Sequence, residues 1–280
     1  MSDIIAEVVG LNRFAVKSFG GESVIMLPVG PRGPAHDRRY MFARPEGKRK
    51  FMSQRDFPLL CLCQARLNGG TIVLSAPNTT DLELPLLGEG SKKTIVTMHK
   101  KKFQVTISLS MAGKWLGDFL TDRGVKIDFE PLAVFQTEED ERYVKPEARA
   151  PGIAVRLQDG YPFMALSTAS LHDLNSRLPP GEPASEMDQF RPNIILGKCG
   201  AYAEDSITGV QVGDVTFMGE SNCTRCATIQ TNQHTGKRSK EPMTTLRNYR
   251  HTRNGSPEFG KNLSHLNTGT IRVGDFVRRI

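Results

Sequence analysis

Two cysteines separated by two residues form the sharpest chemical motif in the sequence, Cys223-Thr224-Arg225-Cys226. A pair with this spacing can ligate zinc, exchange a disulfide, or present one thiolate to a soft metal ion or a sulfur atom. A neighbouring cation favours the thiolate form of a cysteine, and Arg225 directly precedes Cys226. Two buried, unreactive cysteines are the fourth interpretation, and the motif alone leaves all four open.

The rest of the sequence weakens two of these interpretations. A closed zinc site needs about four nitrogen or sulfur ligands, but the chain has one Cys-x-x-Cys motif, and Cys61 and Cys63 lie far upstream. A thioredoxin-like redox pair stands at a strand-to-helix turn in a βαβ unit, whereas polar sequence follows Cys226. The five cysteines are also too few, and odd in number, for a disulfide framework.

The positive charge of the chain points to an anionic partner. Its 280 residues carry a formal net charge of +7. Two basic segments, Lys48-Arg49-Lys50 and His99 to Lys102, are typical of solvated loop tips, and docking of an acidic redox protein is the alternative. We expect no nucleic-acid partner, because neither an aromatic-interleaved single-strand motif nor a helix-turn-helix pattern accompanies the charge.

Several common functions lack their sequence motifs. The chain has no dinucleotide fingerprint, P-loop, Gly-x-Ser-x-Gly elbow or His-Glu-x-x-His helix. It has no apolar run of about 20 residues that could span a bilayer, and its first residues lack the basic and apolar regions of a signal peptide. We therefore expect a cytoplasmic protein that does not associate with membranes.

The elements that must position the cysteines are predicted to be mostly strands. In the first half, an Asn68-Gly69-Gly70 turn predicts a hairpin, and an apolar stripe from Trp115 to Leu120 predicts a helix ending near Gly124. The polar segment 136–151 predicts a loop between two halves. The predicted strands of this half cover 59–65, 71–74, 95–98 and 103–107, the last two joined by a turn at 99–102.

The second half repeats the excess of strands over helices. A helix over 170–178 is expected, with Ser170 and Asp173 as its cap and Pro179-Pro180-Gly181 as its stop. The predicted strands and turns are a short strand at 153–157, a strand after Phe190, and hairpins turning at Gly213-Asp214 and Gly274-Asp275. Without βαβ alternation, the sequence predicts a mainly β, or α+β, fold of antiparallel barrel-like sheets with a few helices.

A series of short segments also occurs in an order and spacing typical of one family. In the second half they are Phe190-Arg191-Pro192-Asn193-Ile194, Ala203-Glu204-Asp205, Gly213-Asp214-Val215, Cys223-Thr224-Arg225-Cys226, Phe259-Gly260-Lys261-Asn262 and Gly269-Thr270-Ile271-Arg272. They resemble the MOSC domain, named for the C-terminal part of molybdenum cofactor sulfurase. Lys17-Ser18, His36-Asp37-Arg38-Arg39 and Gln54-Arg55 resemble the β-barrel domain that precedes MOSC. The implied organisation is an N-terminal barrel domain at 1–135, a linker at 136–151 and a MOSC domain at 152–280.

Within that family the chain is similar to the mitochondrial amidoxime reducing components and their bacterial counterparts, which bind a molybdenum–pterin cofactor (molybdopterin). The resemblance implies that Cys226, not Cys223, ligates the molybdenum, and that Asp159 stands near the metal, where a carboxylate can accept a hydrogen bond or move a proton. The residues implied to hold the cofactor have the donors that a phosphate and a pterin need: Lys17, Ser18, Arg38, Arg191, Asn193, Thr224 and Arg225.

The implied function is a molybdenum-cofactor-dependent oxidoreductase that reduces small N-hydroxylated compounds. The sequence has no iron–sulfur, flavin or haem motif, so the electrons are expected from a separate electron-transfer protein. The alternative is a carrier that binds molybdenum cofactor, or sulfane sulfur on Cys226, without steady-state turnover. A third interpretation keeps the fold as an interaction module only.

Overall fold

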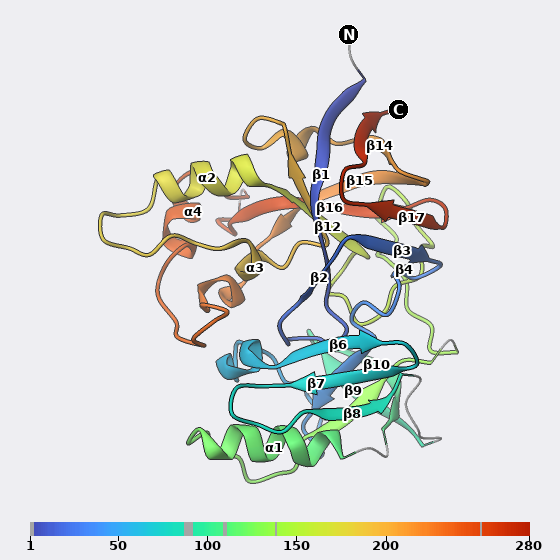
Figure 1. Ribbon diagram of the computed structural model, residues 1–280, viewed down its shortest axis with the longest axis vertical. Helices are drawn as coiled ribbons and strands as arrows, with labels where there is room; N and C mark the ends of the chain where they lie inside the picture. Colours follow the sequence, from blue (N-terminus) through green and yellow to red (C-terminus); the bar gives the residue numbers. More distant parts are fainter. Residues whose placement is uncertain (1–2, 87–91, 109–110, 138, 253) are drawn as a thin grey trace.

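Strands dominate this computed structural model, which describes residues 3–86, 92–108, 111–137, 139–252 and 254–280 (Figure 1). Four sheets and a few short helices account for the regular structure of the described residues. The mainly β, α+β fold class expected from the sequence is therefore confirmed.

A closed β-barrel forms the upper part of the molecule in Figure 1. Its strands are β1 (Ile4–Arg13), β12 (Phe163–Ser167), β13 (Ile194–Gly197), β14 (Gly209–Val212), β15 (Val215–Thr224), β16 (Glu258–His265) and β18 (Phe276–Arg279). They follow the order β13-β12-β16-β15-β14-β18-β1, and β1 pairs back to β13. Neighbours are antiparallel, except that β12 and β13 run parallel across the connection through α2 (Thr168–Ser176). The first strand of the chain thus closes a barrel built from its second half.

Alternation along these strands fills the barrel with apolar side chains. Val8 and Leu11 of β1 are both buried although three positions separate them, because a bulge between Val8 and Gly10 shifts the register. Phe163 and Phe217 meet edge to face with ring centres 5.0 Å apart. Burial of each such side chain contributes about 1.5–3 kcal/mol, so the barrel is a packed core rather than a channel.

Two smaller sheets and α1 (Ala112–Asp122) form the lower part of Figure 1. One sheet has the order β5-β11-β10-β9 and the other β6-β7-β8. Trp115, Leu116, Phe119 and Leu120 pack from α1 into the core beside the second sheet, as the sequence predicts. The strands are β5 (Tyr40–Ala43), β6 (Gln64–Asn68), β7 (Thr71–Ser75), β8 (Leu82–Pro85), β9 (Lys93–Met98), β10 (Lys101–Ile107) and β11 (Leu132–Phe135).

Short elements complete the fold around the barrel. β17 (Gly269–Arg272), β3 (Met26–Gly30) and β4 (Gly33–Pro34) form a small sheet, and β2 (Glu22–Val24) pairs with β1. The remaining helices are α3 (Met187–Phe190), α4 (Met243–Tyr249) and the 3₁₀ helices η1 (Pro58–Leu62), η2 (Ala203–Ser206) and η3 (Ala227–Gln230). Among the described residues, no helix combines the length and the apolar character that crossing a membrane requires.

The hairpins at Asn68-Gly69-Gly70 and Gly213-Asp214 are confirmed, as is the hairpin that turns after Met98. Two strand predictions are wrong. Residues 58–62 form η1 because Pro58 has the fixed φ of a first helical residue, and the strand starts only at Gln64. Residues 153–157 form no strand. Ala154 makes one bridge to Tyr143, and the apolar alternation there reflects packing of a loop against the core.

Two details of the second half also differ from expectation. Helix α2 is capped by Ser167 rather than Ser170, since the Ser167 side chain accepts the backbone N–H of Ser170 at 3.0 Å. The turn at Gly274-Asp275 does not form a hairpin. Its flanking strands enter different sheets, because β17 pairs with β3 while β18 pairs with β14 and β1.

Pairing between distant parts of the chain links the two halves. β1 and β3 come from the first thirty residues, yet they pair with strands of the last hundred. The segment 136–151 contains no helix or strand among its described residues, and Asp140, Val144 and Ala148 within it are buried. The division at 135 and 152 remains a prediction from the sequence.

Candidate functional site

One pocket collects the residues that the sequence analysis assigned to a site. Side chains of the barrel strands β12, β15 and β16 line it together with side chains of loops, among them the turn between β9 and β10. The predicted site residues in the lining are Lys17, Ser18, Arg38, Asp159, Arg191, Asn193, Thr224, Arg225 and Cys226. Their gathering from five separate segments supports a shared ligand, whereas the role of each residue stays a prediction.

Two arginines lie together on one wall of the pocket. The guanidinium carbons of Arg38 and Arg191 each lie 4.3 Å from the ring centre of Phe14. Nη2 of Arg38 also donates to the carbonyl of Arg191 at 3.3 Å. A desolvated cation–π contact contributes up to about 2 kcal/mol, so the buried ring fixes both cations. We call Arg38, Arg191, Phe14, Asp37 and Asn193 the arginine cradle.

A fully buried carboxylate, Asp37, holds the arginine cradle in place. Its Oδ1 accepts hydrogen bonds from the backbone N–H of Phe14 at 2.9 Å and from Nδ2 of Asn193 at 3.1 Å. Its Oδ2 accepts from Nη1 of Arg38 at 2.8 Å and from Nε2 of Gln158 at 3.3 Å. Such a charge is tolerated inside a protein only with partners of this kind. Asp37 is not among the site residues predicted from the sequence, and its position next to Arg38 was the one signal for it.

The charge of the cradle exceeds what the protein neutralises locally. Burial lowers the pKa of Arg191, and the neighbouring guanidinium of Arg38 lowers it further, while Asp37 acts in the opposite direction. A guanidinium nevertheless stays protonated in proteins, so the unfavourable surroundings are relieved when an anion binds. The forked donors of arginine suit phosphate oxygens in particular.

Three predicted site residues have left-handed backbone conformations. The φ angles are 75° at Ser18, 45° at Arg38 and 58° at Arg191. Each such residue costs on the order of 1–3 kcal/mol and persists only where its surroundings hold it. The backbone N–H of Arg38 donates to the carbonyl of Phe14 at 2.7 Å, and the Ser18 hydroxyl donates to the carbonyl of Met52 at 3.1 Å. Strain held in this way is a feature of functional sites.

The side chain of Asn193 is occupied by bonds within the protein. Its Oδ1 accepts from Nη1 of Arg38 at 3.1 Å, and its Nδ2 donates to the carbonyl of Asn12 at 3.2 Å as well as to Asp37. Asn193 therefore orients Arg38 toward the pocket. The hydroxyl of Ser18 is likewise engaged, by the carbonyl of Met52.

A second charged group lies on another part of the lining. Nζ of Lys17 and Nε2 of His99 both contact Oδ1 of Asp159, at 2.5 Å and 2.8 Å. Burial lowers the pKa of Lys17, and Asp159 offsets part of that effect. Although loss of water raises the pKa of Asp159, the charges of Lys17 and His99 hold it well below its usual value. Asp159 is therefore a carboxylate at neutral pH.

The cysteine loop, residues 223–226, places its two sulfur atoms in different surroundings. Cys226 is exposed where η3 begins, with its Sγ 3.2 Å from Oγ1 of Thr228. Cys223 packs against an apolar cluster, and Nη1 of Arg225 donates to its sulfur at 2.9 Å. The guanidinium of Arg225 thus contacts Cys223, whereas its adjacency to Cys226 in the sequence predicted a contact with Cys226. Residues two apart on extended chain share a side, and direct neighbours do not.

Comparison with known proteins identifies the family of the chain. Residues 153–278 match the MOSC domain, and residues 5–123 match the MOSC N-terminal beta barrel domain. The chain belongs to the MOSC-domain family. It is 34% identical over 263 residues to mitochondrial amidoxime-reducing component 1 of Mus musculus, a match that covers 87% of this chain and 72% of that protein.

Two further relatives of this MOSC protein carry related names. The Homo sapiens mitochondrial amidoxime-reducing component 1 is 34% identical over 264 residues, with 87% of this chain and 72% of that protein covered. Component 2 of Rattus norvegicus is 30% identical over 286 residues, covering 95% and 81%. The family resemblance expected from the sequence motifs is therefore confirmed.

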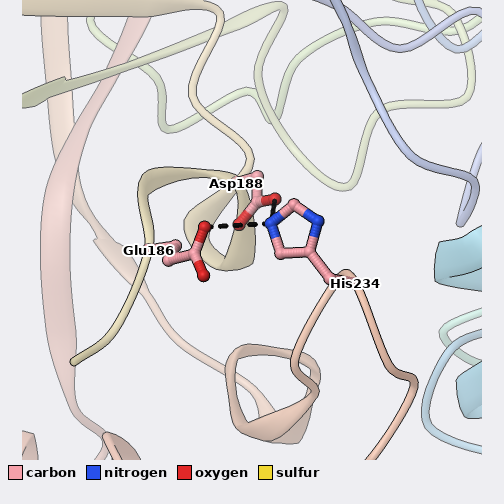
Figure 2. Close-up of side chains that lie close together, drawn as sticks. All are labelled: Glu186, Asp188 and His234. Carbon is pink, nitrogen blue, oxygen red and sulfur yellow. Dashed lines mark hydrogen bonds and ion pairs between the residues drawn. The ribbon is translucent and has the colours of Figure 1, made fainter. Parts of the chain in front are cut away.

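The cysteine loop of the MOSC protein lacks the further ligands that a zinc site would need among the described residues. Among the described residues, the single group of three potential ligands is Glu186, Asp188 and His234, and it contains no cysteine (Figure 2). The two carboxylates contact Nε2 of His234 at 2.9 Å and 3.4 Å, and the bond from Glu186 raises the pKa of that imidazole. Each side chain is at least 40% exposed, so the group behaves as a solvated ion pair, which contributes at most about 1 kcal/mol.

Proposed function

We propose that this MOSC protein is a molybdenum–pterin-dependent reductase of N-hydroxylated compounds, supplied with electrons by a separate redox protein. The observation that carries the proposal is the meeting of the exposed thiol of Cys226 with the arginine cradle in one pocket. The names of relatives that are 34% identical to the chain support the substrate class, since they refer to the reduction of amidoximes.

The pocket fits a polar, anionic cofactor of this kind. Arg38 and Arg191 bring two guanidinium cations to the pocket, and the N–H groups that are not bonded to Asp37, Asn193 and backbone carbonyls are donors for a phosphate. The surroundings of the two cations lack a full complement of negative charge. Among the described residues, Nε of Arg225 and Oε1 of Gln158 are buried without a hydrogen-bond partner, and both residues line the pocket. A donor and an acceptor left unpaired at a pocket are what the edge of a pterin ring would satisfy.

The protein and the cofactor would divide the work. When bound, the metal centre supplies the redox chemistry that an N–O bond requires. The thiolate of Cys226 is a soft ligand suited to it, the arginine cradle holds the phosphate, and Lys17 and Thr224 add a cation and a hydroxyl to the lining. Asp159, ionised and held by Lys17, accepts hydrogen bonds beside the reacting group.

Substituting alanine for each of the two cysteines in turn tests the proposal. The chain is purified from a host that makes the cofactor, its metals are counted by elemental analysis, and reduction of an amidoxime is followed with an artificial electron donor. We expect about one molybdenum per chain and steady turnover. Cys226→Ala should abolish turnover, and the matched control Cys223→Ala should largely keep it. Zinc in place of molybdenum, or the reverse order of the variants, would overturn the proposal.

A carrier of molybdenum cofactor or sulfane sulfur is the alternative that the exposure of Cys226 also permits. A carrier binds one equivalent and passes it to an acceptor protein, so it shows no steady-state reduction. Continuous turnover of an N-hydroxylated compound by the molybdenum-loaded chain therefore favours the reductase. Binding without turnover favours the carrier.

The surface next to the pocket suits an acidic electron donor. Segments 48–50 and 99–102 meet there, because the N–H of Thr97 donates to the carbonyl of Arg49 and Thr97 bridges Lys50. His99 of the second segment lines the pocket itself. Lys101→Glu combined with Lys102→Glu should slow turnover with a protein donor about tenfold at low salt and leave turnover with the artificial donor unchanged. Lys126→Glu, beyond the end of α1, is the matched control, and an equal effect of both changes would contradict this docking surface.

A further inference from the structure

We propose that His99 supplies the proton that leaves with the substrate oxygen, and that Asp159 holds the imidazole in position for this transfer. The inference rests on the proposed reductase function and assigns a role to a residue that stood in the sequence only as part of a basic turn. The role follows from the position of the His99 imidazole, which the turn between β9 and β10 sets.

The geometry points the imidazole into the pocket while leaving a path to solvent. Nε2 of His99 lies 2.8 Å from Oδ1 of Asp159, and the ring meets Phe51 edge to face with centres 5.3 Å apart. The side chain is 37% exposed and also lines the pocket that contains Cys226. A carboxylate that fixes a histidine at a reaction site is a recurring arrangement for proton transfer.

The charges around the ring favour His99 over Asp159 as the source of the proton. Asp159 is ionised, because Lys17 and His99 both face its carboxylate. Nη2 of Arg142 donates to the backbone carbonyl of Asp159 at 3.0 Å. Phe51, which packs against the imidazole, has the guanidinium carbon of Arg55 5.8 Å from its ring centre. Lys17 is held by Asp159 and by the carbonyl of Leu157. Imidazole is the side chain that gains and loses a proton between about pH 5 and 8.

The reaction needs protons as well as electrons. Reduction of a hydroxylamine, R–NH–OH, breaks the N–O bond with two electrons from the redox donor and two protons. One proton adds to the nitrogen to give R–NH₂, and the other joins the oxygen, which leaves as water. Because Nε2 faces Asp159, the imidazolium of His99 would donate the second proton from Nδ1, which then recovers a proton from solvent through the exposed part of the side chain. Asp159 stays ionised throughout and balances the imidazolium charge.

Kinetics of the loaded enzyme provide the first test. With the artificial donor, His99→Ala should lower kcat at neutral pH about tenfold or more and leave KM nearly unchanged. Imidazole added to the buffer should restore kcat, which a merely structural defect would not allow. Lys126→Gln removes a charge beyond the end of α1, outside the pocket lining and both basic segments, and serves as the control with unchanged kcat. A His99→Ala enzyme with the parental kcat and pH profile, or without rescue, overturns the inference.

A second test needs neither cofactor nor turnover. In the apoprotein, the Nε2–H of His99 should give a resolved NMR resonance because Asp159 protects it from exchange, and Asp159→Ala should lose that resonance. Its presence in both proteins would overturn the pairing. If the molybdenum-loaded parent shows no turnover, the proposed function fails. If the parent turns over and His99→Ala matches it, the inference alone fails.

Discussion

The two walls of the pocket differ in how firmly the protein holds them. In the arginine cradle, Asp37 and Asn193 are buried and donors from four segments converge on one carboxylate. In the cysteine loop, Cys226 and Thr224 are exposed, and the sulfur of Cys226 touches one hydroxyl. A binding wall must be preorganised to hold its ligand, whereas a reacting thiol must remain accessible. This contrast is the one expected if the arginine cradle binds the ligand and the cysteine loop supplies the reacting thiol.

The largest expected effect of a single substitution compares stability across the two walls. Asp37→Ala removes the acceptor for four donors and leaves the charge of Arg38 unpaired, so the free energy of unfolding should fall by about 3–5 kcal/mol. Cys226→Ala should change it by no more than about 0.5 kcal/mol, because the side chain is exposed. Urea unfolding of both variants measures the two changes in unfolding free energy. A loss of less than about 1 kcal/mol in Asp37→Ala would contradict the proposed difference between the two walls.

A second prediction separates binding from folding within the cradle. Arg191→Met should weaken binding of inorganic phosphate about tenfold or more, because a charge-assisted hydrogen bond is lost. The free energy of unfolding should stay the same or rise, since burial beside Arg38 disfavours the charge that is removed. Calorimetric titration with phosphate and thermal unfolding provide the two readouts.

The control for this prediction is Arg177→Met. Arg177 forms an exposed ion pair with Asp173 on α2, outside the pocket lining, so phosphate binding should be unaffected. Equal loss of phosphate affinity in the two variants would mean that the cradle is not the anion site.

The smallest effect concerns pH and the Lys17–Asp159 pair. The pKa of Asp159 in the folded chain lies well below its ordinary value of 3.8, so the pair stabilises the fold above about pH 4. That contribution is lost as the pH falls below 3.8 toward the folded pKa. The difference in unfolding free energy between the parent and Asp159→Asn should be about 1 kcal/mol or less near pH 7, because the carboxylate is 69% exposed. It should shrink on acidification, and a growing difference would contradict the assigned sign.

Local patterns carried most of the fold prediction. The turn at Asn68-Gly69-Gly70 and the apolar stripe of α1 are read from a few neighbouring residues, and both were confirmed. The strands on either side of Gly274 were assigned to one hairpin because their partners, β3 and β14, are far away in sequence. A turn motif states that the chain reverses there, but it does not state which sheet each arm joins.

The site was predictable in its members and less so in its internal contacts. Family motifs named nine residues that line the pocket together. They did not show that Arg225 contacts the sulfur of Cys223, or that the hydrogen bonds of Asn193 are all to protein groups. Asp37 and His99 were missed as site residues because their partners Asn193 and Asp159 lie 156 and 60 positions away, and such pairing leaves no local periodicity.

Closure of the barrel by β1 has a consequence for how the chain folds. β1 is synthesised before its partners β13 and β18: Glu7 pairs with Gly197, 190 residues later, and with Phe276, 269 residues later. Contacts at such separation carry a large loop-closure entropy and form slowly. During synthesis, the edge of β1 that pairs with β13 stays unpaired until β13 has been made, and pairing with β18 comes later still. A fragment that begins at residue 152 would therefore expose the edges of β13 and β18 to other strands, and we expect it to aggregate rather than fold alone.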